Sequence, residues 1–172
     1  MRALLAVIAL SLSWALAHAA DPPKLAVFDF ELIDTSLQGE VYGKRSDEQE
    51  RLKKTGDQVR RELGESGKFL ILDIASVNAA AHQNNLQACG GCDSKLARQL
   101  GADLYITGTV QKVSNLILNV NVYLHDAQSG RLITEASADM RGNTDESWSR
   151  ATHYLMKERL LAPNYGGPSA RR

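Results

Sequence analysis

Strict alternation of apolar and polar residues marks the second half of the chain. Every second residue of 115–125 is apolar, from Leu116 to Leu124, and a period of two predicts a strand with one buried face. The alternation returns over 131–140, after a glycine-containing loop at 126–130. These segments therefore predict an antiparallel hairpin. The other row of the first strand includes Asn119, Asn121 and Tyr123.

Apolar runs elsewhere predict the remaining strands, and longer amphipathic segments predict helices. The strands are expected at 24–30, 68–73 and 102–113. The helices are expected at 46–63, 74–84, 94–100 and from 143 to the proline at 163. The polar stretch 31–45, which contains two glycines, is predicted to be a long loop.

Helix starts are indicated by polar residues at capping positions. Ser46 with Gln49, and Asn143 with Glu146, have the spacing of a capping box, in which each side chain bonds the other residue's backbone amide. Asp93 is expected to cap the short helix that follows it.

The predicted order of elements is β-α-β-α-α-β-β-β-α. The first half of this order is typical of strand–helix–strand crossovers, and the second half is typical of an antiparallel meander. This combination predicts a single α+β domain, in which helices pack on a mixed β-sheet.

The first nineteen residues have the three parts of a secretory signal peptide. Arg2 precedes an apolar run from Ala3 to Leu16, and Ala17-His18-Ala19 is a small-residue cleavage pattern. The run is shorter than the roughly 20 residues that span a bilayer. No cysteine stands near the cleavage point, so we expect an exported, non-lipidated periplasmic protein with no membrane span after cleavage.

Three parts of the chain are therefore expected. They are a signal peptide at 1–19, a mixed α/β domain at 20–162 and a disordered tail at 163–172, which is rich in glycine and proline.

Composition narrows the class of protein. Hydrophobic residues make up 44% of the chain, enough for a core, and the 20 basic residues equal the 20 acidic ones. A net charge of zero argues against a protein that binds nucleic acid mainly by electrostatic attraction. Two cysteines and four histidines leave little material for a metal site, and no cofactor is predicted.

Cys89 and Cys92 form the sharpest motif, Cys-Gly-Gly-Cys. In an oxidising compartment two cysteines at this spacing favour a disulfide that pins the loop before a helix. A redox-active pair is the second interpretation, because a helix start lowers the pKa of a thiol. Metal or haem binding is the third, although Asp93 stands where covalent haem attachment needs a histidine.

Other chemical signals in the sequence are weak. Asp29 interrupts the first apolar strand, but no second site residue can be assigned to it from sequence. Four basic residues of the first long helix, Lys53, Lys54, Arg60 and Arg61, interleave with acidic ones and favour a solvated face. No nucleophile elbow, phosphate loop or dinucleotide fingerprint is present. The row of Asn119, Asn121 and Tyr123 is a candidate binding face, with an ordinary solvent face as the alternative.

Several segments resemble known families over roughly residues 24–161. The segments KLAVFDF, KFLILD and LARQLGADLYITGTV resemble the amino-terminal domain of the Tol–Pal periplasmic translocation protein and the periplasmic domain of the curli secretion lipoprotein. The segments ACGGCD and MRGNTDESWSRATHYL resemble an exported bacterial family of unknown function. The resemblance implies a small mixed-sheet domain used for assembly or envelope contacts, without catalytic residues.

The leading hypothesis is a soluble, non-enzymatic accessory or binding protein of the periplasm that acts through an envelope protein partner. The alternatives are a thiol–disulfide redox protein using Cys89 and Cys92, and a small-ligand carrier using the polar row of the 115–125 strand.

Overall fold

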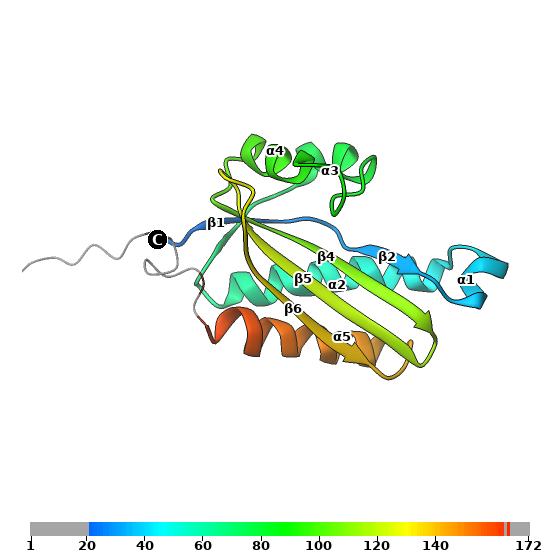
Figure 1. The fold of residues 1–172 in the computed structure, drawn as a ribbon. Helices are drawn as coiled ribbons and strands as arrows, with labels where there is room; N and C mark the ends of the chain where they lie inside the picture. The colour runs from blue at the N-terminus through cyan, green and yellow to red at the C-terminus, as the bar shows by residue number, and fades with distance from the viewer. Residues whose placement is uncertain (1–20, 164, 166–172) are drawn as a thin grey trace, which may run out of the picture.

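A single mixed sheet organises the molecule (Figure 1). The computed structural model describes residues 21–163 and 165, so the predicted signal peptide and most of the predicted tail lie outside the described residues. The strand order is β3-β1-β4-β5-β6, with β2 also beside β4; β1, β2 and β3 run parallel to their neighbours, and β4, β5 and β6 are antiparallel. The strands are β1 (Lys24–Val27), β2 (Glu31–Asp34), β3 (Leu70–Ile71), β4 (Leu104–Ser114), β5 (Ile117–Asp126) and β6 (Leu132–Met140).

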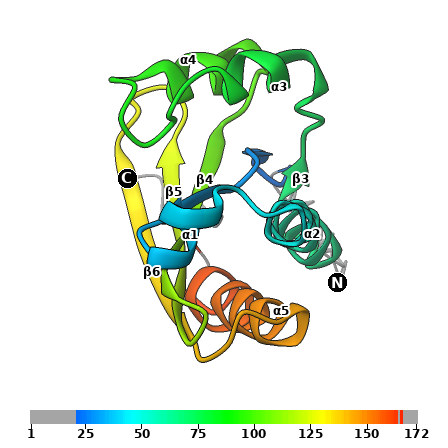
Figure 2. The ribbon, with the colours of Figure 1, turned by 90° about the vertical axis from the view of Figure 1, so that its right-hand side faces the viewer.

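Helices pack on both faces of this sheet, and the predicted α+β architecture is confirmed. The helices α2 and α5 cover one face, and α3 and α4 cover one end of the other (Figures 1 and 2). The helices are α1 (Leu37–Tyr42), α2 (Ser46–Glu65), α3 (Ala75–His82), α4 (Cys92–Gln99), α5 (Asp145–Tyr154) and the π-helical continuation η1 (Leu155–Leu161).

The polar segment 31–45 is the largest departure from the prediction, because it contains β2 and α1 instead of a loop. β2 is held by parallel pairing with β4 from Glu31 opposite Thr109 to Asp34 opposite Lys112. α1 begins after Ser36, whose hydroxyl accepts a hydrogen bond from the Gly39 amide at 3.1 Å. No residue of α1 is buried, which is why the segment lacks an apolar period.

The main core lies between the sheet and the helices α2, α5 and η1. The apolar row of β5 is buried there as predicted, except for Leu116, which is 72% exposed because the strand begins one residue later. Trp148, Leu155 and Met156 of the last helix pack against the same core. The core also contains Leu118, Val120, Val122, Leu124, Leu25, Val27, Val59 and Leu63.

A second, smaller core lies under α3 and α4. Tyr105 is fully buried there, and its ring stacks on His125 with centroids 4.7 Å apart. Its hydroxyl donates to Asp93 at 2.8 Å, and burial followed by this hydrogen bond raises the pKa of Tyr105. Asp93 therefore fixes Tyr105 and does not cap α4 as predicted, because α4 begins at Cys92, two residues before the predicted start, and Asp93 lies inside it.

Both predicted capping boxes are also wrong. α2 begins after Arg45, and no side chain caps it. α5 is capped by Thr144, whose hydroxyl accepts from the Ser147 amide at 3.2 Å. Asn143 is used elsewhere, because its side chain accepts from the Trp148 indole at 3.0 Å.

A buried ion cluster ties the far end of β4 to its surroundings. The ammonium of Lys112 lies 2.7 Å from Glu48 and 3.1 Å from Asp34, and the Lys112 and Glu48 side chains are fully buried. The Asn143 amide also donates to Glu48, at 2.6 Å. Burial alone lowers the pKa of Lys112, but the hydrogen bonds to Glu48 and Asp34 outweigh it and raise that pKa. The cluster joins β4 to the start of α2, the end of β2 and the loop before α5.

Replacing Lys112 should destabilise the folded protein, because the buried carboxylate of Glu48 would lose its charged partner. We expect Lys112→Met to lower the free energy of unfolding by about 3–5 kcal/mol, measured by urea denaturation. Adding Glu48→Gln to this variant should restore part of the loss, since the amide carries no charge. The exposed control Arg150→Met should change stability by less than about 0.5 kcal/mol. A Lys112→Met protein as stable as the control would contradict this account.

Candidate functional site

A bulge between β1 and β2 shapes the site. Val27 lies opposite Ile106 and Glu31 lies opposite Thr109, so four steps along one strand match three along β4. Such a bulge bends a strand and redirects its side chains. Phe30 packs on Gly108, where a Cβ would overlap its ring. The bulge leaves Asp29 at the end of β1, facing the helices.

The chain then creates a cleft at the carboxyl end of β1. From β1 the chain passes through β2 and α1 into α2 on one face of the sheet, and from β3, which pairs with β1, it enters α3 on the other (Figure 2). Neighbouring parallel strands whose helices go to opposite faces leave a crevice, where α/β proteins commonly bind ligands. Here the cleft has a volume of about 1090 Å³.

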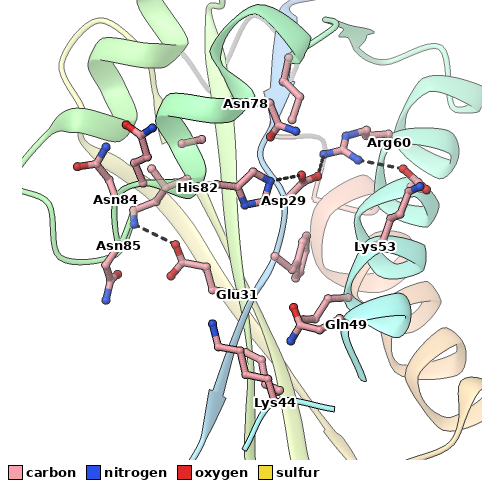
Figure 3. Close-up of a pocket in the computed structure, with 18 of the residues that line it drawn as sticks. Asp29, Glu31, Lys44, Gln49, Lys53, Arg60, Asn78, His82, Asn84 and Asn85 are labelled. Atoms are coloured by element: carbon pink, nitrogen blue, oxygen red, sulfur yellow. Dashed lines mark hydrogen bonds and ion pairs between the residues drawn. The ribbon is translucent and has the colours of Figure 1, made fainter. Parts of the chain in front are cut away.

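Asp29 and Arg60 meet at the centre of this cleft (Figure 3). The Arg60 guanidinium pairs with Asp29 and Asp57 and donates twice to the Val27 carbonyl, at 2.9 and 3.1 Å. His82 Nε2 lies 3.0 Å from the second Asp29 oxygen. Partial burial raises the pKa of Asp29, but Arg60 and then His82 lower it below its ordinary value. Residues from β1, α2 and α3 are thereby joined in one network.

The remaining polar groups of the cleft differ in how they are engaged. Glu31 accepts a hydrogen bond from the Leu86 amide at 3.1 Å. Lys44 and Lys53 are exposed at the rim, and neither forms an ion pair with the described residues. The Asn78 side-chain oxygen is buried on the α3 side and accepts no hydrogen bond from the part of the chain that the structure describes.

This arrangement suits recognition of polar groups. Its central carboxylate is neutralised by Arg60 and hydrogen-bonded by His82. Within residues 21–163 and 165, no three or more His, Cys, Asp or Glu side chains form a group that could hold a metal ion. The cleft therefore offers amide groups and rim lysines to a ligand.

The candidate face formed by Asn119, Asn121 and Tyr123 lies away from this cleft. All three side chains are half-buried, on the sheet face opposite the β5 apolar row. The Asn121 amide donates to Asn119 at 2.8 Å and to Thr109 at 3.2 Å. A binding role for this face stays a prediction.

Cys89 and Cys92 form a disulfide, with Cα atoms 5.6 Å apart. Gly90 and Gly91 between them have φ angles of 67° and 104°, which only glycine adopts readily. Cys92 is the first residue of α4. The bond therefore closes a tight turn at a helix start, and both of its cysteines are half-exposed.

Sequence reasoning noticed Asp29 but missed its partners. Arg60 was assigned to a solvated helix face, whereas its side chain is only 20% exposed and bonds the end of β1. His82, one of the four histidines of the chain, is given no role by the sequence. The only available signal was a charged residue inside an apolar strand, which normally requires a partner of opposite charge.

Comparison with known sequences places this fold in a family. A family profile matches residues 23–160, which is most of the chain. The chain belongs to the DUF3280 family, described as "Protein of unknown function (DUF2380)". The predicted membership of a family of unknown function is thus confirmed, and no curated protein matches this DUF3280 member.

Two solved structures of LpoB share the fold of this DUF3280 member, and TolB is a weaker match. The C-terminal domain of LpoB from Salmonella enterica is 15% identical, with a TM-score of 0.53 and coverage of 73% of this chain and 87% of that one. LpoB from Escherichia coli is 16% identical, with a TM-score of 0.51 and coverage of 69% and 56%. TolB from Acinetobacter baumannii is 15% identical, with a TM-score of 0.41 and coverage of 79% and 28%.

Within residues 21–163 and 165, no helix combines the length and the apolar character that crossing a membrane requires.

Asp29→Asn should weaken the junction between β1, α2 and α3. We expect a loss of about 1–2 kcal/mol at pH 7, because the partly buried Arg60 loses one of its two charged partners and keeps only the exposed Asp57. The pKa of Asp29 is lower in the folded state, so its stabilisation is fully present above its unfolded pKa of about 3.9 and is lost as pH falls through the folded pKa. Urea denaturation across this pH range should show the difference from wild type shrinking in acid. A stability difference between Asp29→Asn and wild type that stays constant with pH would contradict this account. The exposed control Asp139→Asn should change the stability less.

Proposed function

We propose that this protein is a non-enzymatic accessory protein of the bacterial envelope that binds a partner protein in the cleft between α2 and α3. The observation that carries the proposal is the cleft itself, whose central charges neutralise one another while amides and rim lysines face its space. Such a surface, in a cleft of about 1090 Å³, can hold a polar chain by hydrogen bonds.

The signal peptide predicted from the sequence supports the same proposal. The proposed location is the periplasm, reached through the signal peptide at 1–19, with no lipid anchor. The sequence resemblance to the Tol–Pal translocation protein, together with the fold shared with the C-terminal domain of LpoB, supports a role in envelope contacts.

Thiol–disulfide exchange is the second candidate function. It is favoured by one observation, the position of the half-exposed Cys92 at the start of α4, because a helix N-terminus stabilises a thiolate. A stabilising role for the Cys89–Cys92 bond in the loop before α4 is the proposal we prefer.

Photocrosslinking in the bacterium of origin tests the partner proposal. A photoreactive amino acid at Gln49, which lines the cleft from α2, should give a discrete adduct with another protein. The same residue at Arg61, which is exposed on the same helix outside the cleft, should not. Equal adducts at both positions, or none at Gln49, would overturn the proposal.

Replacing both cysteines separates the two candidate functions. The double variant Cys89→Ser, Cys92→Ser should lose about 2 kcal/mol of stability, the loop-closure contribution of so short a loop, and should keep the Gln49 adduct. Urea denaturation and the crosslinking assay measure the two effects. A folded double variant that loses the adduct would favour thiol–disulfide exchange.

A further inference from the structure

The edge of β2 that faces away from β4 opens into the cleft. The Thr35 amide donates to the Lys112 carbonyl at 2.9 Å. Amide and carbonyl groups alternate sides along a strand, so those of Glu31 and Ile33 point toward β4 and those of Leu32 and Asp34 point away from it. Leu32 and Asp34 both line the cleft. The cleft therefore contains backbone donors and acceptors spaced as in a strand.

On the same side of the sheet, the edge of the preceding strand β1 is already paired. β3 pairs there with β1, since Leu70 and Leu72 donate to the Pro23 and Leu25 carbonyls at 3.0 and 2.9 Å. β3 ends at Ile71, and the next outward carbonyl, that of Val27, is bonded by Arg60. Beyond Arg60 the edge continues as β2, and no described strand pairs with its outer side.

We propose that β2 accepts an extended, acidic segment of the partner protein as an added strand, in line with β3. This proposal rests on the proposed function and names the form of the partner. Backbone bonds to Leu32 and Asp34 would give affinity, and the side chains of the added strand would give specificity.

Charge decides the chemistry of the segment. The cleft is lined by five carboxylates, and each is engaged: Asp29 and Asp57 by Arg60, Asp34 by Lys112, and Glu31 and Asp73 by the Leu86 and Ala75 amides. Lys44 and Lys53 are the lysines that line it, and both are exposed without an ion pair to the described residues. Acidic side chains on the added strand would complement them.

The position of the edge favours a single peptide over a second copy of the sheet. Side chains of α2 and α3 line the cleft together with residues of β2, so a helix flanks the β2 edge on either side (Figure 3). The β2 edge of a second molecule carries the same two helices. They would meet those of the first before the two edges reached hydrogen-bonding distance, whereas one extended chain avoids this contact.

The experiment uses a phage-displayed library of random decapeptides selected on the purified protein. The selected peptides should be enriched in Asp and Glu. A synthetic copy of the best one should slow amide hydrogen exchange at Leu32 and Asp34 by about tenfold or more, because these amides become hydrogen-bonded. In the free protein these two amides should exchange faster than those of Ile33 and Thr35. Absence of selected binders, or binders that leave Leu32 and Asp34 unprotected, would overturn strand addition.

Two matched pairs of variants locate the contacts of the selected peptide. Leu32→Pro removes the amide that points into the cleft and should weaken binding by about tenfold or more relative to Leu32→Ala, which keeps that amide. Lys53→Glu should weaken binding more than Arg61→Glu, which changes the net charge equally. Circular dichroism checks that each variant folds. If Leu32→Pro does not fold, the comparison of Lys53→Glu with Arg61→Glu still tests where the peptide binds. Equal affinities of Lys53→Glu and Arg61→Glu for the peptide would overturn the preference for acidic segments.

The two proposals fail in different ways. A crosslink from Gln49 combined with unprotected Leu32 and Asp34 amides would keep the protein partner and reject strand addition. Strand addition by a selected peptide without any crosslink in the cell would reject the proposed function.

Discussion

The buried ion pair between Lys112 and Glu48 is the constraint on which the far half of the molecule depends. A charge without solvent is tolerable only when partners surround it, and here the partners come from α2, β2 and the loop before α5. Each of these segments must therefore reach the end of β4. This requirement holds the short strand β2 in place, although no residue of β2 is fully buried, and it sets the start of α2 beside the cleft.

The cleft follows from a mismatch in strand length. β4 is paired along most of its length on one side by β5, but its other side is shared by the short strands β1 and β2 with a bulge between them. β3 extends beside β1 only. The Val27 carbonyl, which would otherwise bond a longer β3, is bonded by Arg60. The same guanidinium holds Asp29, so one side chain both ends the pairing at this edge and places the carboxylate.

The elements that could be predicted from sequence are those whose signal is local. The β5–β6 hairpin was predicted from alternation alone, because its apolar row packs against one continuous core. β2 and α1 could not be, since β2 depends on pairing with residues 78 positions away and α1 buries nothing. The capping boxes failed because Asn143 is used by the buried cluster and α2 begins without a side-chain cap. The site is predictable only at Asp29, because Arg60 and His82 lie 31 and 53 residues away in sequence.

An exposed strand edge is a hazard, because it can pair with the edge of another sheet and start aggregation. The outer strand β6 carries Glu135 and Asp139 on its solvent side, both exposed. β2 is protected differently: Arg60 bonds the preceding carbonyl, Lys44 and Lys53 place charge at the rim, and two helices flank the edge. Because the helices only flank β2, its outer backbone groups remain able to form hydrogen bonds. A loop that covered the edge would have used those groups in its own hydrogen bonds. The fold thus excludes a second sheet while keeping room for one extended chain.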